Sequence, residues 1–433
     1  MLTAALEAEF GPTTASARVE IVRAPGRVNL IGDHTESNDG YVLPAAIELD
    51  TWIAFRRRQD GYVRIKSRHR NEAGSFWIDA LEPAHVPGGG TIDSGEEKRG
   101  VAGDSAETSG SARAGATSAA AISAPPAAVA APPATQWSDY VAGVAWSLRE
   151  AALPIRGLDG VVDTTIPIGS GMASSAALEL AAATALLEGG RGPSTAALAA
   201  LAHRAERDYV GVDGGISDQF ASAAGREGKA LFLDCRSLET RYVSLPFGVR
   251  VVVCVTGTRR DLRSPASNVR RAECARAVAL LSERMPGLCS LRDLDAASLR
   301  RYASILPEHV ARRAEHIVGE NARVVATAAA MESGDLDELG RLFGESHASL
   351  RDRFDVSSPA LDAMVEVASA IPGVVAARMT GVGFGGCTVN LVLADAVPAL
   401  QAAVSREYDR RTGLRGRAYP VAIVDGAGPL SLE

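Results

Sequence analysis

Apolar and polar residues alternate, or apolar residues form short runs, at several places in the first half of the chain. These patterns predict strands at residues 19–22, 41–47, 51–55, 62–66 and 161–166. Asp60–Gly61 lies just before one of these runs and predicts a hairpin turn. Helical spacing of apolar residues predicts helices at 137–148, 176–187, 194–206 and 218–224.

The second half combines strand-like runs with helix-like runs. Strands are predicted at 230–233, 242–245 and 250–255, helices at 268–281 and within 299–350, and a strand–glycine loop–strand unit at 374–393. This order predicts an α+β fold. We place a domain boundary near 226–229, which gives an N-terminal domain of residues 1–226 and a C-terminal domain of residues 227–433.

Residues 86–135 differ from the rest in composition. They are rich in Gly, Ala, Ser and Pro and have almost no large apolar side chain. Such a segment cannot bury enough surface to offset its ordering entropy, so we predict a disordered insertion. A partner-binding role is the alternative, but no aromatic anchor or block of like charge supports it.

Charge and cysteine content exclude several classes of protein. A net charge of −7 argues against nucleic acid or an anionic membrane as the main partner. The five cysteines form no C-x-x-C pair, so we expect no disulfide framework and no zinc site. No apolar stretch approaches the ~18 residues of a membrane helix, and no targeting signal is evident. We therefore expect a cytoplasmic protein, and a monomer.

The segment between the run at 161–166 and the helix at 176–187 predicts an anion site. It contains Gly169, Ser170, Gly171, Met172, Ala173, Ser174 and Ser175. Small residues let the backbone approach an anion, and the free N–H groups at a helix start favour negative charge. The lysine of the P-loop pattern is missing, so a nucleotide bound here would need other cations.

A dense polar cluster follows the first predicted strand. Arg27, Asp33, His34 and Glu36 lie within ten positions among apolar residues, and buried charges must be paired or serve a ligand. The alternative is a solvated loop with an incidental ion pair. Asp218 also has two interpretations, because a carboxylate at a helix start is either a cap or a functional group.

A glycine-rich loop occurs near the C-terminal end. Residues 381–386 satisfy the G-x-G-x-x-G pattern, but the alternating run at 387–393 predicts a strand, whereas the dinucleotide fingerprint opens a helix. We interpret the loop as a glycine hairpin. Either its backbone approaches a substrate or the facing domain, or it is a tight structural turn.

Several segments together resemble the galactokinase branch of the GHMP sugar and metabolite kinases. Residues 26–35 resemble the sugar-site signature, 167–177 the phosphate motif, 215–220 the catalytic-aspartate segment, 270–274 the second-domain helix and 379–389 the C-terminal glycine motif. The resemblance covers residues 19–393. It implies a two-domain GHMP kinase fold, with an N-terminal mixed β-sheet with helices, a C-terminal α/β-layered domain and an active site in the cleft between them.

The resemblance also implies a reaction, the transfer of the γ-phosphoryl group of ATP to the anomeric hydroxyl of a galactose-like sugar. Asp218 would accept or orient the hydroxyl proton, as a base or as an electrostatic clamp, while Arg27 would meet the phosphoryl group. The loop at 169–175 would bind ATP. Ser175 and Glu206 match the positions expected to hold Mg²⁺. Glu206 has an alternative as well, an ion pair with a neighbouring arginine on a solvated face.

Trp137 and Tyr140 match aromatic positions beside the nucleotide base in that family. Their alternative is ordinary core packing.

The sugar-binding residues that the resemblance implies are Asp33, His34, Glu36, Gly215 and Ser267. The usual signature reads Glu-His-Thr-Asp-Tyr, whereas this chain exchanges the two carboxylates, and Ser267 stands where the family has a tyrosine. Because O–H···O bonds tolerate only a narrow range of distances, a different hexose or hexosamine remains an alternative substrate. A non-catalytic sensor of sugar and ATP is a further alternative.

Overall fold

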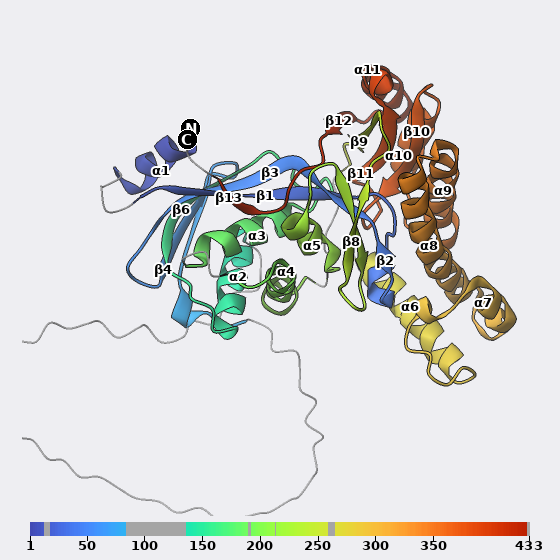
Figure 1. Ribbon diagram of the computed structural model, residues 1–433, viewed down its shortest axis with the longest axis horizontal. Coiled ribbons are helices and arrows are strands. Elements are labelled where there is room, and N and C mark those ends of the chain that lie inside the picture. The colour runs from blue at the N-terminus through green and yellow to red at the C-terminus, as the bar shows by residue number, and fades with distance from the viewer. Residues whose placement is uncertain (13–17, 84–135, 189–191, 213, 259–264, 431–433) are drawn as a thin grey trace, which may run out of the picture.

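The computed structural model describes residues 1–12, 18–83, 136–188, 192–212, 214–258 and 265–430, with the side chains of 265–267 excepted. Figure 1 shows a strand-rich part built mainly from the first half of the chain beside a helix-rich part built from the second half. The predicted insertion at 86–135 and the side chain of Ser267 lie outside the described residues.

The largest sheet lies in the first part. Within the described residues it has six strands in the order β13-β1-β3-β6-β4-β5. Their bounds are β1 Glu20–Asn29, β3 Pro44–Arg57, β4 Tyr62–Ser67, β5 Glu72–Trp77, β6 Leu158–Thr164 and β13 Gly428–Leu430. The β4–β6 pair is parallel and the other pairs are antiparallel, so the sheet is mixed.

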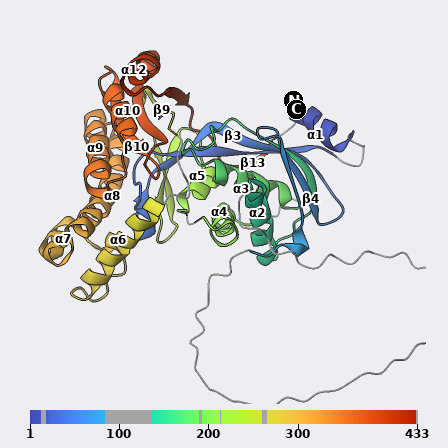
Figure 2. The same cartoon turned by 180° about the vertical axis from the view of Figure 1, so that it is seen from behind.

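Helices cover one face of this sheet, and the short helix α1 lies at one end of the other face (Figures 1 and 2). One face carries α2 Ser138–Glu150, α3 Ser174–Leu186, α4 Thr195–Arg204 and α5 Ser217–Ala224. The other carries α1 Leu2–Phe10, whose Leu6 packs with Val161 of β6. Ser194 caps α4 as predicted, since its side chain accepts a hydrogen bond from the Ala197 amide.

Three strand predictions in this part were wrong in detail. The first strand continues past residue 22 to Asn29, because a bulge between Pro25 and Gly26 lets the proline stay in the ladder. Residues 44–57 form one strand where two were predicted. Asp60–Gly61 does not join neighbouring strands, because β6 lies between β3 and β4.

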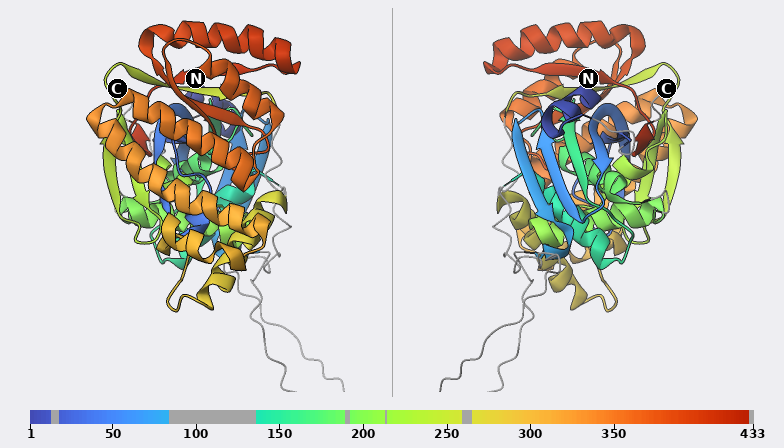
Figure 3. Two further views of the ribbon diagram at one scale, coloured as in Figure 1. Left: turned by 90° about the vertical axis from the view of Figure 1, so that its right-hand side faces the viewer. Right: turned by 90° about the vertical axis from the view of Figure 1, so that its left-hand side faces the viewer.

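The second part is built on a four-stranded antiparallel sheet, counted over the described residues, in the order β10-β11-β9-β12. Its strands are β9 Val249–Val255, β10 Val374–Thr380, β11 Cys387–Leu393 and β12 Arg417–Val421. The helices of this part are α6 Pro265–Ser282, α7 Ala296–Tyr302, α8 Glu308–Ser333, α9 Leu336–Ser349, α10 Pro359–Ser369, α11 Val397–Ala403 and α12 Asp409–Thr412. Figure 3 (left) shows α8 and α9 side by side on the outer surface.

The two parts share strands and a core. A small sheet joins β2 Tyr41–Val42 to β7 Lys229–Asp234 and β8 Thr240–Ser244, and β13 returns to pair with β1. The main apolar cluster runs without interruption from β1 and α3 to β9, α8 and α9. The α+β architecture is therefore confirmed, whereas the boundary at 226/227 stays a prediction.

No helix among the described residues is both long enough and apolar enough to cross a bilayer.

Candidate active site

The predicted phosphate loop joins β6 to the first turn of α3. Gly169 and Gly171 have φ angles of 77° and 90°, and Ala173 has a φ of 55° directly before the helix. These left-handed residues turn the backbone sharply, so that the loop ends at the N-terminus of α3, where backbone N–H groups lack helical partners. The first two residues of α3 are Ser174 and Ser175. The loop has the local geometry of an anion site.

Arg27, on β1, connects this loop to α5. Its Nε donates to Asp218 Oδ1 at 2.7 Å, and its Nη1 donates to the Gly171 carbonyl at 2.7 Å. Its amide also donates to the Met172 carbonyl at 3.2 Å. Burial lowers the pKa of Arg27, but attraction by Asp218 and other carboxylates outweighs burial and the net direction is upward. The guanidinium therefore stays charged beside the loop.

Glu36 reaches the same place from the other side. The Ser217 amide donates to Glu36 Oε1 at 2.8 Å. A Cβ atom at Gly215 would lie 1.5 Å from Glu36 Oε2, so only glycine leaves room for this carboxylate. Desolvation, together with repulsion by Asp218, raises the pKa of Glu36 to about 7. Arg27 and Glu36 thus form one cluster with Asp218, which lies about 180–190 positions later in the sequence.

Glu206 and Ser175 also come together. Glu206 is buried in a π-helical turn, Ala205–Val210, and the Ser175 side chain is close enough to its carboxylate to act on its pKa, in the downward direction. Burial, followed by repulsion from Asp218, raises the pKa of Glu206 to about 7. The solvated-face alternative does not fit this burial, and Arg204 and Arg207 pair with Asp208 instead.

These two side chains suit a hard divalent cation, because they offer a carboxylate and a hydroxyl oxygen beside a phosphate loop. Among the described residues, no group of three or more His, Cys, Asp or Glu side chains is placed to hold a metal ion.

Asp33 lies where the two parts of the chain meet. Its Oδ1 accepts a hydrogen bond from the Gly381 amide at 2.8 Å, and its Oδ2 accepts one from Arg378 Nη2. Arg378 is fully buried on β10 and also donates to the Leu30 carbonyl. The glycine hairpin at 381–386 therefore approaches the facing part of the chain, in agreement with the first of its two interpretations.

His34 follows in a left-handed conformation, with a φ of 67°. Its ring lies 4.5 Å from the Phe354 ring, and the His316 ring lies 4.7 Å from Phe354. His316, on α8, contacts the Asp33 carbonyl at 3.2 Å, and burial lowers the pKa of His316 to about 4. A neutral histidine of the second part thus supports the sugar-signature loop.

The roles of three residues, Trp137, Tyr140 and Ser267, stay as predictions. Trp137 is buried in the main apolar cluster, as its core-packing alternative requires, and Tyr140 is partly buried on α2. Their contact with a nucleotide base, and the role of Ser267, remain predictions.

Sequence reasoning missed several residues that support the site, namely Glu179, Gln219, His316, Glu320 and Arg378. One signal was available, because Glu179 is the single charged residue in the apolar run at 176–187. Gln219 directly follows Asp218 within the segment 215–220, but no role was assigned to its own side chain. The other three lie 283–348 positions after the residues they contact, so no local pattern could find them.

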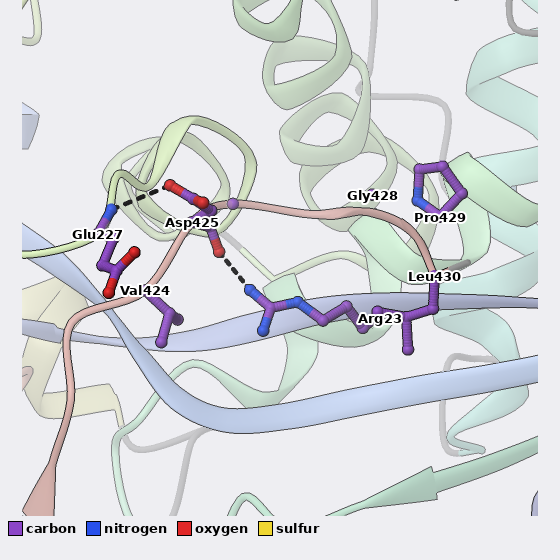
Figure 4. Close-up of a pocket in the computed structure, with 8 residues that line it drawn as sticks. Arg23, Glu227, Val424, Asp425, Gly428, Pro429 and Leu430 are labelled. Atoms are coloured by element: carbon purple, nitrogen blue, oxygen red, sulfur yellow. Dashed lines mark hydrogen bonds between the residues drawn. The ribbon is translucent and has the colours of Figure 1, made fainter. Parts of the chain in front are cut away.

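A surface cavity of about 390 Å³ lies apart from these groups (Figure 4). Arg23 donates to the Asp425 carbonyl there, and the Glu227 amide donates to the Asp425 carboxylate. The cavity shares no lining residue with the predicted site, so it is not part of the candidate active site.

Three family models match this chain. The galactokinase galactose-binding signature matches residues 5–57, the GHMP kinases N terminal domain matches 139–226, and the GHMP kinases C terminal model matches 327–410. Curated galactokinases are similar along almost the whole length. The Chloroflexus aurantiacus protein is 39% identical and the alignment covers 99% of this chain and 96% of the relative. The Roseiflexus sp. protein is 38% identical, with 94% and 92% covered.

Solved structures agree with these matches. Lactococcus lactis galactokinase complexed with galactose superposes with a TM-score of 0.82 at 31% identity, covering 99% of this chain and 98% of that one. Methanococcus jannaschii mevalonate kinase superposes with a TM-score of 0.59 at 14% identity, covering 95% and 100%, which shows a common fold alone.

Proposed function

The chain belongs to the galactokinase family of the GHMP kinases, and from this we propose that it transfers the γ-phosphoryl group of ATP to the anomeric hydroxyl of galactose. It is an ATP-dependent sugar kinase. The observation that carries our assignment of the reacting groups is the Arg27–Asp218 pair, held at 2.7 Å beside the phosphate loop.

In this proposal, Asp218 accepts or orients the proton of the sugar hydroxyl that attacks phosphorus. Arg27 holds Asp218 in place and presents positive charge where the phosphoryl group is transferred. Its bond to the Gly171 carbonyl ties that charge to the loop that binds ATP. Phosphoryl transfer needs positioning and charge stabilisation more than covalent chemistry, and these groups supply both.

We propose Mg²⁺ as the divalent cation, held by Ser175 and Glu206 together with nucleotide phosphates. Bound there, the ion would neutralise negative charge on the phosphates. The burial of Glu206 and the nearness of the Ser175 side chain to its carboxylate support this assignment.

A second candidate substrate is a different hexose or hexosamine, and one observation favours it. Both carboxylate oxygens of Asp33 already have protein partners, Gly381 and Arg378. Glu36 and His34 would then take a larger share of sugar recognition than the usual Glu-His-Thr-Asp signature implies.

The test is a sugar panel assayed by ADP release with ATP and Mg²⁺, with the product identified by phosphorus NMR. We expect galactose to be the best substrate and to give galactose 1-phosphate. Asp218→Asn should lower kcat by about 10²–10⁴-fold. Asp163→Asn, which removes a surface partner of Arg68, is the control and should keep normal turnover.

If another hexose or hexosamine in the panel is the better substrate, the second candidate replaces galactose as the proposed substrate. Normal turnover in Asp218→Asn, or no sugar 1-phosphate from any hexose, would overturn the assignment.

A further inference from the structure

Gln219 bridges two buried carboxylates that come from different elements. Its Nε2 donates to Glu206 Oε2 at 2.9 Å and to Glu179 Oε2 at 2.9 Å. Gln219 and Glu179 have no exposed surface, and Glu206 is 6% exposed. The amide therefore joins α3, which begins with the phosphate loop, to the turn that carries Glu206, and does so from α5, directly after Asp218.

The chemistry of an amide suits this place. An amide nitrogen carries two N–H donors, and here one is directed to each carboxylate, so rotation of the amide would lose both bonds. The donors are neutral, unlike those of lysine or arginine. A neutral donor can fix the direction of the Glu206 carboxylate without neutralising the charge that a cation needs.

The pairing of Gln219 with the two carboxylates leaves two buried oxygens of the described residues without a hydrogen bond, and this destabilises the fold. Within the described part of the chain, Glu179 Oε1 and Gln219 Oε1 are buried and have no hydrogen-bond partner. A well-packed apolar group would avoid this cost, because buried acceptors without donors are destabilising. Burial, together with repulsion from Glu206, raises the pKa of Glu179 well above its ordinary value, which favours a neutral group there.

We propose that Gln219, anchored by Glu179, is a positioning residue that holds the Glu206 carboxylate toward the cation of the ATP complex. The inference rests on the proposed function in one respect, that Glu206 binds the metal. It adds that the affinity for the metal also depends on two residues that do not bind it, Glu179 on α3 and Gln219 on α5, through their hydrogen bonds.

The test measures metal binding directly, by titrating each purified full-length variant with Mn²⁺ in the presence of ADP and recording the free ion by EPR. Gln219→Met keeps the size of the side chain but removes both donors. It should weaken Mn²⁺ binding about 10- to 100-fold. The Mg²⁺ concentration for half-maximal turnover should rise by a similar factor, while KM for the sugar stays within about twofold.

Two variants of Glu179 distinguish the positioning of Gln219 by a hydrogen bond from an effect of side-chain packing alone. Glu179→Gln keeps an acceptor for the Gln219 amide and should retain Mn²⁺ affinity within about threefold. Glu179→Leu removes the acceptor and should behave like Gln219→Met. If Gln219→Met does not fold, this pair decides the question.

Asn390→Leu is the matched control. Asn390 is fully buried on β11 and donates to the Val252 carbonyl at 2.8 Å, far along the chain from the site. The variant should lower Tm without changing Mn²⁺ affinity.

Unchanged Mn²⁺ affinity in Gln219→Met and in Glu179→Leu, with affinity lost in Glu206→Gln, would overturn the positioning role and leave the metal ligand in place. Unchanged affinity in Glu206→Gln itself would overturn this inference together with the metal assignment of the proposed function.

Discussion

At the scale of single residues, the candidate site holds several carboxylates close together, with Glu206 buried and Glu36 and Asp218 partly buried. Glu36 and Glu206 both have pKa values raised to about 7, mainly by burial and then by repulsion from Asp218. Arg27 is the positive group placed among them. Such a site has an excess of negative charge that a metal ion would relieve.

The raised pKa of Glu36 predicts a pH dependence of stability. Between pH 4.5 and about 7 the folded protein keeps a proton on Glu36 that the unfolded chain releases, so this residue destabilises the fold increasingly as pH rises and fully above about pH 7. Glu36→Gln should therefore stabilise the ligand-free protein at pH 8, by at most about 3 kcal/mol, and much less at pH 4.5. Urea unfolding across this range measures the difference. A stabilisation that does not change with pH would contradict the prediction.

The buried Arg378 predicts a large loss of stability. Arg378→Met would leave the Asp33 carboxylate without its charged partner. It would also remove the positive charge that lies 3.8 Å from the Glu320 carboxylate. Removing one partner of a buried ion pair costs about 3–5 kcal/mol. Denaturant unfolding should show this loss, together with weaker binding of galactose.

Arg341→Ala is the control for Arg378→Met. It breaks exposed pairs with Glu338 and Glu345 and should cost less than about 1 kcal/mol. If both variants lost the same free energy of unfolding, burial of the Arg378–Asp33 pair would contribute no more to stability than an exposed pair does.

At the scale of elements, β1 and the phosphate loop are in direct contact at a glycine. A Cβ atom on Gly26 would lie 2.7 Å from the Met172 carbonyl oxygen and 3.2 Å from the Leu49 carbonyl oxygen, and both are backbone atoms. The bulge between Pro25 and Gly26 in the β1–β3 ladder lies at this contact. The position of the ATP loop therefore depends on a strand that also carries Arg27.

Gly26→Ala should displace the loop and lower kcat/KM for ATP, by up to about 100-fold, since displacements near 1 Å can have such effects. Steady-state kinetics with ATP varied measures this. Gly344→Ala is the control, because a Cβ atom there meets no heavy atom within 4 Å in helix α9, and it should stabilise the fold by about 0.5–1 kcal/mol. Normal ATP kinetics in Gly26→Ala would contradict the role of this contact.

Elements with strong local signals could be predicted from sequence, whereas their neighbours in space could not. The Ala/Leu run of α3 and the hairpin β10–β11 match their predicted positions closely. Separate strands were predicted at 41–47 and 51–55, but residues 44–57 form one strand, and within it Asp50 lies 3.5 Å from Arg23 on β1. Asp60–Gly61 indicates only that the chain reverses direction. It does not indicate that β6, which follows about a hundred positions later, pairs between β3 and β4.

The site shows the same division. The loop residues, Arg27 and Asp218 follow from motifs, but the partners of Asp33 come from β10 and the loop after it. Contacts of this kind depend on packing across the whole chain, and nothing near Asp33 in the sequence indicates them.

At the scale of the whole molecule, the two parts share one apolar core and the small sheet of β2, β7 and β8. Buried polar contacts from α8 to the sugar-signature loop add to this, including the Gly32 amide donating to Glu320 at 3.1 Å. We therefore predict one cooperative unfolding transition. Calorimetry should give equal calorimetric and van't Hoff enthalpies. Two resolved transitions, or a ligand that shifts only one of them, would contradict this.

The pairing of β13 with β1 has a consequence for biosynthesis. Arg23 and Asp425, which meet beside these strands, are 402 positions apart. At 5–20 residues per second, a ribosome needs roughly 20–80 s to make that stretch. During this time β1 presents an unpaired edge, the kind of surface on which nascent chains associate with one another. We therefore expect slower translation to lengthen the exposure of this edge of β1, at residues 21–23, in the nascent chain.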